Sequence, residues 1–198
     1  MKTTGIKAIG NFLYTYESDL LYILSFQRHR QKKISISDFA NKQGGIFYKF
    51  LSEFRVTRNF DKGKSEEILK LTNFWLDKQR SEDIDGFAAL LKSKGLTRDK
   101  TMTSLASKIL FLTSPWNIFP MDRQAKETLM HKSDNRYENF LPKVKKYKTE
   151  KSKFIKDTLT YLNPYLTTIE KKFKNDLDDL GTIRKNRFVD KLLWTGGL

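Results

Sequence analysis

A single aspartate, Asp122, stands near the end of the segment SPWNIFPMDRQAK, which spans residues 114–126. The two prolines before it favour a turn, and the residues after it favour a helix. Aspartate is a preferred N-cap residue because its side chain accepts hydrogen bonds from the free backbone N–H groups of the first turn. A carboxylate in such a place also stays ionised near neutral pH, since the helix dipole favours the anion. Asp122 is therefore either a plain helix cap or a charged group that takes part in chemistry, and the two roles are compatible.

The two aromatic residues of this loop, Trp116 and Phe119, also have two interpretations. Aromatic rings near basic residues can stack on nucleic-acid bases or wedge between them. Aromatic residues in a loop can equally anchor it to an apolar core. The sequence favours the anchoring role without excluding the other.

Positive charge dominates the composition, with 38 Lys+Arg against 23 Asp+Glu and a formal net charge of +15. Such a field attracts polyanions, and nucleic acid before all, because cationic side chains neutralise phosphates and release counterions. The alternative is a lysine-rich surface that only keeps the protein solvated. Because the basic residues are clustered as well as numerous, the sequence favours a nucleic-acid partner.

The first basic cluster, QRHRQKK at residues 27–33, supplies Arg28, Arg30, Lys32 and Lys33. These four side chains either grip phosphates or belong to a solvated turn. Further clusters lie at 143–156, 171–174 and 184–187. Several contain or adjoin an aromatic residue, but aromatic residues at helical spacing are more often part of a core.

Apolar residues at i, i+3, i+4 and i+7 predict helices through most of the chain, beginning with residues 8–26. We expect an all-α fold in a single domain over residues 1–198, or two helical lobes with a seam in the polar segment 77–86. Breaks are expected at Pro142 and at Asn163-Pro164, because the residue before a proline is pushed away from helical geometry.

The chain lacks the residues that are characteristic of several classes of function. The chain has no cysteine and two isolated histidines, so we predict no metal site. It has no nucleotide-binding loop, dinucleotide fingerprint or hydrolase elbow, and we predict no cofactor. No apolar run reaches membrane-spanning length and no leader cleavage site is visible, so we expect a cytoplasmic, nucleoid-associated protein with no membrane partner. The oligomeric state is left open.

Residues 92–131 resemble the segment that defines the helix-hairpin-helix DNA glycosylases. In that family a hairpin with a small-residue helix is followed by a Gly/Pro-rich loop and by an aspartate that heads a basic helix. The matching parts here are LASKILFL at 105–112, the loop Phe119-Pro120-Met121, Asp122, and the cationic Arg123 and Lys126 after it. Residues 187–194, RFVDKLLW, also look like the last helix of bacterial proteins that carry this loop.

The resemblance implies base excision, in which the N-glycosidic bond to a damaged or modified base is cleaved through an oxocarbenium-like state at C1′. Asp122 would be the catalytic carboxylate that stabilises the developing positive charge or orients water, with the base flipped into a pocket. Thr97, Arg98 and Lys100 of the hairpin, together with Arg123 and Lys126, would bind the DNA, most simply through its phosphates.

The sequence departs from the family at two places. Bifunctional members carry a lysine nucleophile near the position of Ser104, and neither Lys100 nor Lys108 is in register with it, which implies a monofunctional enzyme. The family's hairpin has two glycines, whereas here only Gly95 is present. Either a longer hairpin uses Thr97, Arg98 and Lys100 on phosphate, or the protein no longer binds duplex DNA. A non-catalytic basic protein that binds nucleic acid on a glycosylase-like scaffold is the main alternative, and a helical ribonuclease is a distant third.

Overall fold

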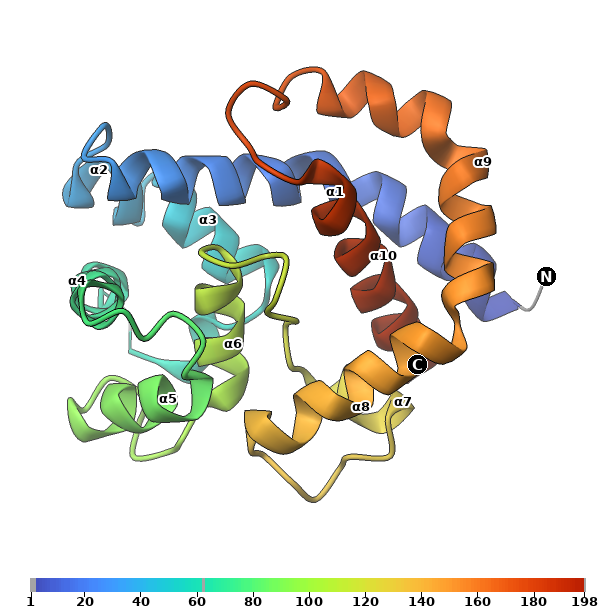
Figure 1. The fold of residues 1–198 in the computed structure, drawn as a ribbon. Helices are drawn as coiled ribbons and strands as arrows, with labels where there is room; N and C mark the ends of the chain where they lie inside the picture. The colour runs from blue at the N-terminus through green and yellow to red at the C-terminus, as the bar shows by residue number, and fades with distance from the viewer. Residues whose placement is uncertain (1–2, 62, 198) are drawn as a thin grey trace. The chain divides into compact units, whose positions relative to one another are not determined.

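The computed structural model describes residues 3–61 and 63–197, and every regular element within these ranges is helical. The expected all-α fold is therefore confirmed. The described elements, which Figure 1 shows in chain order, are α1 (Thr3–Arg30), α2 (Ile36–Ala40), α3 (Ile46–Glu53), the 3-10 helix η1 (Thr57–Asn59), α4 (Ser65–Asp77), α5 (Ile84–Ser93), α6 (Thr103–Phe111), α7 (Arg123–Thr128), α8 (Tyr137–Glu150), α9 (Ser152–Glu170) and α10 (Leu180–Gly196).

The chain divides into two compact units that are interleaved in sequence. The first unit combines the chain up to Leu24 with the chain from Met121 onward, and the second covers Ser25–Pro120. The polar segment 77–86, where the sequence suggested a seam, lies inside the second unit, between the end of α4 and the start of α5. Whether residues 1–198 behave as one domain stays a prediction.

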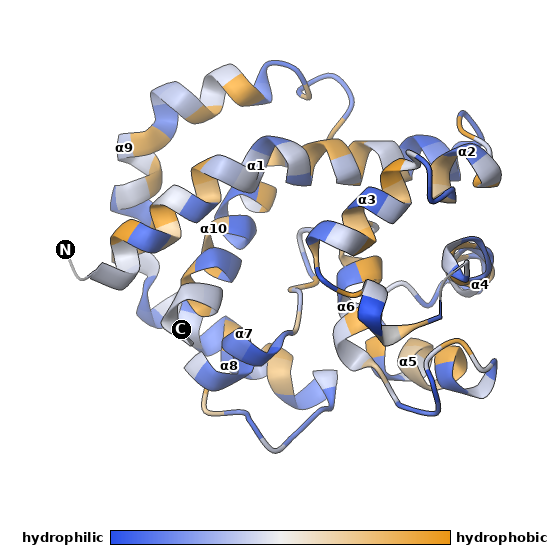
Figure 2. Cartoon of the chain, turned by 180° about the vertical axis from the view of Figure 1, so that it is seen from behind, coloured by the Kyte–Doolittle hydropathy of each residue, from blue (hydrophilic) through white to orange (hydrophobic). Residues whose placement is uncertain are grey.

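The core of the first unit forms where α1, α7, α9 and α10 bury their apolar faces. Phe12, Tyr16 and Leu20 of α1 recur every four residues, which places them on one stripe of the helix, and all three are fully buried. The ring of Phe12 meets that of Phe188 of α10 edge to face at 5.4 Å. Figure 2 shows blue and orange positions alternating along α1 and α9, as expected for helices with one polar and one apolar face.

An aromatic cluster organises the second unit. Phe39 of α2 stacks on Phe47 of α3 with ring centroids 5.7 Å apart, and Phe26 at the end of α1 lies 6.1 Å from Phe39. The apolar face of α5, with Phe87 and Leu91 fully buried, lies in the same unit as α6, and the two helices pack against each other. These two helices form a helical hairpin joined by residues 94–102.

The predicted helix breaks at Pro142 and Pro164 are wrong, because α8 and α9 continue through these residues. A proline inside a helix lacks the N–H that would bond to the carbonyl four residues earlier. The carbonyls concerned belong to Glu138 and Thr160, and both of these residues are exposed, as are the two prolines. Both prolines thus lie on exposed turns, and Figure 1 shows α9 bent but unbroken.

Candidate active site around Asp122

Asp122 is the N-cap of α7. Its backbone is extended, and its Oδ1 accepts a hydrogen bond of 2.9 Å from the backbone N–H of Ala125. The cap predicted from the sequence is therefore confirmed. Its second carboxylate oxygen makes no hydrogen bond with the rest of the described chain, and the residue is only half-buried. Capping thus uses one oxygen of Asp122.

A second carboxyl group, that of Asp190 in α10, is close enough to Asp122 for the two to interact electrostatically. Asp190 is buried, and burial is the main reason why its pKa is raised above the ordinary value. The negative charges of Asp122 and Asp19 raise this pKa further, whereas Arg187 and Lys191 oppose the increase. The site therefore holds two carboxyl groups in different surroundings, one partly open to solvent and one buried.

Arg187 holds the buried part of the site together. Its side chain is 1% exposed, and its Nε and Nη2 donate to Oδ2 of Asp19 at 3.0 and 2.9 Å. Its Nη1 donates to Oδ2 of Asp190 at 3.0 Å. Burial opposes the charge on Arg187, but the two aspartates outweigh this effect and raise the pKa of the guanidinium. Lys191 adds a second cation, with Nζ 4.0 Å from Oδ2 of Asp19.

Close packing of α7 on α10 fixes the position of Asp122 relative to this network. Thr128 Oγ1 donates to the carbonyl of Leu193 at 2.6 Å. Gly197 lies so close to α7 that a Cβ there would stand 2.3 Å from the carbonyl oxygen of Gln124, and a Cβ on Gly196 would stand 2.8 Å from Thr128 Oγ1. Only glycine allows this approach.

The basic residues predicted beside Asp122 already have partners. Lys126 donates from Nζ to Oδ1 of Asn135 at 2.5 Å and to the carbonyl of Asp134 at 3.2 Å. Arg123 is exposed, with Nε 3.9 Å from Oε1 of Glu127. Of the two, Arg123 is therefore the one whose side chain is held only by a weak surface contact.

The hairpin turn between α5 and α6 lies in the second unit. Gly95 has a φ of 67°, and Arg98 and Asp99 also have positive φ values, of 45° and 57°. Thr97 is buried and its hydroxyl donates to the carbonyl of Lys100 at 2.6 Å. Arg98 pairs with Asp61 at 2.9 Å, and Lys100 is exposed. The turn thus adopts left-handed geometry at three residues although only one of them is glycine.

The lysine of bifunctional glycosylases has no counterpart at Ser104, which is half-buried in the first turn of α6. Lys108 of the same helix is buried, and its Nζ donates to the carbonyl of Phe54 at 3.0 Å. A lysine held in this way is a structural donor.

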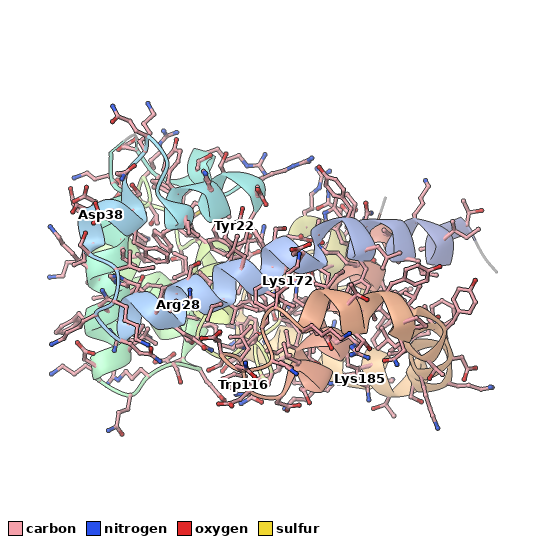
Figure 3. The ribbon with its side chains drawn as sticks, turned by 90° about the horizontal axis from the view of Figure 1, so that it is seen from above. Tyr22, Arg28, Asp38, Trp116, Lys172 and Lys185 are labelled. Carbon is pink, nitrogen blue, oxygen red and sulfur yellow. The ribbon has the colours of Figure 1, made fainter. Side chains whose placement is uncertain are left out.

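The remaining predicted contacts also belong to the second unit. Arg28 is exposed in the last turn of α1 and Trp116 is half-buried in the loop after α6, and Figure 3 labels both. Phe119 is only 3% exposed, so the anchoring interpretation fits it better than stacking. Arg30 donates to Asp77 at 2.6 Å and to the side chain of Asn73 at 3.2 Å. Lys32 and Lys33 follow the helix and are exposed.

Asp19, Arg187 and Asp190 were not among the site residues proposed from the sequence. The sequence does carry a signal for them, because Asp19 interrupts an apolar run in α1 and residues 187, 190 and 191 repeat at helical spacing. A charge in an apolar run needs a partner, but the pattern does not show which one.

Comparison with known proteins finds no family model that matches the chain, and no curated protein or solved structure that resembles it significantly. No helix in residues 3–61 and 63–197 is both long and apolar enough to span a membrane. In the same part of the chain, no group of three or more His, Cys, Asp or Glu side chains is placed to hold a metal ion.

Proposed function

We propose that the protein binds nucleic acid, most simply DNA, and cleaves the N-glycosidic bond of a damaged or modified base, with Asp122 as the catalytic carboxylate. The observation that carries the proposal is the pair of carboxyl groups, Asp122 half-exposed and Asp190 buried with a raised pKa. Pairs of titratable groups in contrasting surroundings are typical of sites where one group stays charged to perform chemistry. The order hairpin, loop, aspartate, basic helix agrees with the resemblance in residues 92–131.

The reaction breaks the bond from C1′ of the sugar to the base, and the bonding electron pair leaves with the base. The free oxygen of Asp122 would face the positive charge that develops at C1′ and O4′. Water adds to C1′, and its proton passes to the departing base or to solvent. Asp190, Arg187 and Asp19 would not touch the substrate. We assign them as positioning residues, because they join α10 to α1 while α7 packs on α10.

A non-catalytic role is the alternative, and two observations favour it. The Oδ1 of Asp122 has a sufficient structural task as the cap of α7. The hairpin has one glycine where the family has two, which removes one bare backbone contact to phosphate. A basic helical protein that only coats nucleic acid would keep both features.

Replacing Asp122 by asparagine separates the two functions, because asparagine caps a helix as well as aspartate does but carries no charge. We expect the wild type to release a base from one member of a panel of oligonucleotides with damaged or modified bases. Asp122→Asn is expected to lower that rate by about 10²- to 10³-fold while binding is unchanged. Released base is read by mass spectrometry, and strand breaks that appear only after alkali would indicate a monofunctional enzyme.

A matched control is Asp83→Asn, since Asp83 caps α5 through the same contact, from Oδ1 to the N–H of Gly86 at 2.8 Å. This variant should keep full activity. The glycosylase proposal is abandoned if the wild type leaves every base in place, or if Asp122→Asn is as active as the wild type.

A further inference from the structure

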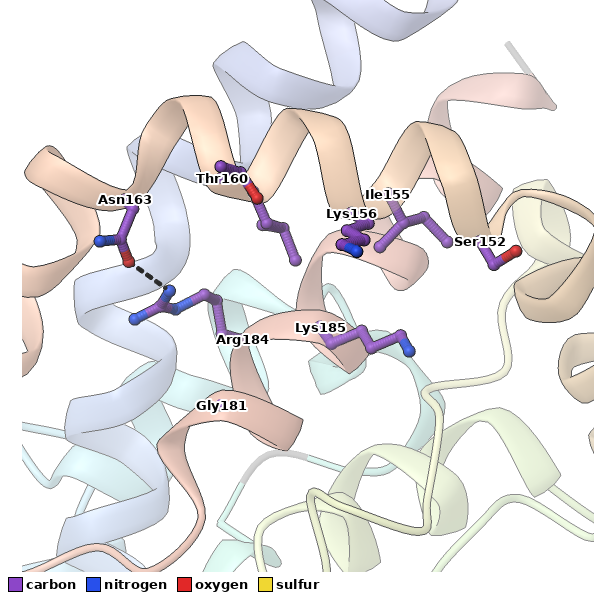
Figure 4. A pocket seen from close by; sticks show the side chains of 9 residues that line it. Ser152, Ile155, Lys156, Thr160, Asn163, Gly181, Arg184 and Lys185 are labelled. Carbon is purple, nitrogen blue, oxygen red and sulfur yellow. Dashed lines mark hydrogen bonds between the residues drawn. The ribbon is translucent and has the colours of Figure 1, made fainter.

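A pocket of about 580 Å³ opens between α9 and the first turns of α10, within the first unit and apart from Asp122 (Figure 4). This volume is in the range of pockets that bind small ligands or single building blocks of polymers. Lys185 at its rim and Asp190 are five residues apart in α10, which places them on different faces of that helix. The pocket is therefore separate from the candidate active site.

The lining combines an apolar floor with a cationic rim. Ile155, which is fully buried, and Leu159, which is half-buried, supply the apolar part of the lining, and both come from α9. The ammonium groups of Lys156 from α9 and Lys185 from α10 border the pocket from the two helices, with the hydroxyl of Ser152 nearby. Apolar surface beside cations suits a ligand with an anionic group and an apolar or aromatic body.

The two lysines are the available charges of the pocket. Arg184, the third cation of the lining, is ion-paired with Glu170 and also donates to Oδ1 of Asn163 at 2.9 Å. Lys156 and Lys185 are exposed, and neither makes an ion pair or a hydrogen bond with any described residue. An incoming anion would therefore meet two cations that no carboxylate of the described chain neutralises.

Further positive charges lie around the pocket. Lys148 of α8 donates to Oδ1 of Asn186 at 2.6 Å, and its pKa is lowered by burial and by the charges of Lys185 and Lys145. Residues 143–156 hold seven lysines and one glutamate, so cations continue from the pocket along α9 into α8. A bound anion would relieve this repulsion. A lysine-rich stretch suits a polyanion better than a single phosphate.

We propose that this pocket holds one nucleotide unit of a nucleic-acid strand, with its phosphate between Lys156 and Lys185 and its sugar or base against Ile155 and Leu159. Neighbouring phosphates of the strand then lie along the lysines of α8 and α9. The proposal shares the nucleic-acid partner of the proposed function but does not depend on any chemistry at Asp122.

The test compares Lys156→Ala/Lys185→Ala with Lys42→Ala/Lys49→Ala, which removes the same charge from exposed positions of the second unit. Binding of a fluorescent single-stranded oligonucleotide is measured by polarisation over a range of salt concentrations. The pocket variant should bind more weakly than the control, and its slope of log K against log salt should be smaller by about 1.4, corresponding to two lost phosphate contacts. Circular dichroism checks that both variants are folded, and Lys156→Glu/Lys185→Glu should weaken binding further.

Equal affinities and slopes for the pocket variant and the control would overturn the proposal. So would a nucleoside monophosphate that binds the wild type as tightly as the strand does, because the pocket would then be a small-molecule site. Pocket-dependent binding without any base release would leave this proposal standing and reject only the glycosylase function.

Discussion

The contacts of a single residue, Arg187, show how burial changes the contribution of an ion pair to stability. Its contact with Asp19 and the contact of Arg98 with Asp61 have the same length, 2.9 Å. The first pair is 1% and 3% exposed, whereas the second is 59% and 64% exposed. Water screens the exposed pair, but it cannot replace a lost partner in the buried one.

We therefore predict that Arg187→Ala lowers the free energy of unfolding by about 3–5 kcal/mol, because it leaves Asp19 and Asp190 buried without the cation that donates hydrogen bonds to both. Arg98→Ala, which removes a pair of equal length, should cost less than about 1 kcal/mol. Urea unfolding followed by circular dichroism measures both. Similar small losses for the two variants would show that the buried network contributes little to stability.

The same residue explains what the sequence could and could not predict about the site. The cap at Asp122 was predictable, because a cap is a local contact that spans three residues. The link between Asp19 and Arg187 joins residues 168 positions apart, so it exists only once α1 and α10 have packed. A local pattern shows that a buried charge needs a partner but not which one.

At the scale of elements, the contact between α7 and α10 decides whether Asp122 is held in place. A Cβ on Gly197 would lie within 2.8 Å of three backbone atoms of Gln124, and backbone cannot move aside as a side chain can. Gly197→Ala should therefore push α7 away from α10 and destabilise the protein by about 1–3 kcal/mol. Thermal unfolding measures the change.

Gly10→Ala is the matched control, because Gly10 is exposed within α1 and a Cβ there meets nothing within 4 Å. This change should stabilise the protein by about 0.5–1 kcal/mol, since alanine loses less conformational freedom in a helix than glycine does. Opposite signs for the two substitutions would support close packing at α7. A neutral Gly197→Ala would mean that α7 has room to shift.

The helix breaks wrongly predicted at the two prolines also concern single elements. A rule based on residue type expects a helix to stop before proline, yet α8 and α9 continue through Pro142 and Pro164. Both prolines lie on exposed turns, and exposure is a property of the packed structure. Helix content was therefore easier to predict than helix boundaries.

For the whole molecule, the period of apolar residues was enough to predict an all-α fold, because each helix had to bury one face. Two helical lobes were one expectation from the sequence, but the segments that form each unit were not visible, since the first unit joins the start of the chain to residues far along it. Composition changes mark exposed segments such as 77–86, but they do not reveal which distant segments pack together.

The net charge of +15 makes a prediction for the molecule as a whole. If lysines and arginines bind phosphates, association releases counterions, and affinity must fall as salt rises. With six to ten phosphate contacts, affinity for an oligonucleotide should fall by about 10³- to 10⁵-fold between 50 and 200 mM salt. A titration followed by fluorescence polarisation measures this, with an uncharged-backbone analogue of the same base sequence as the control.

The analogue should bind poorly at every salt concentration. Salt-independent binding of the natural strand, or equal binding of the analogue, would mean that the basic surface is not where nucleic acid binds, and both the glycosylase and the simple binding protein would lose their common basis.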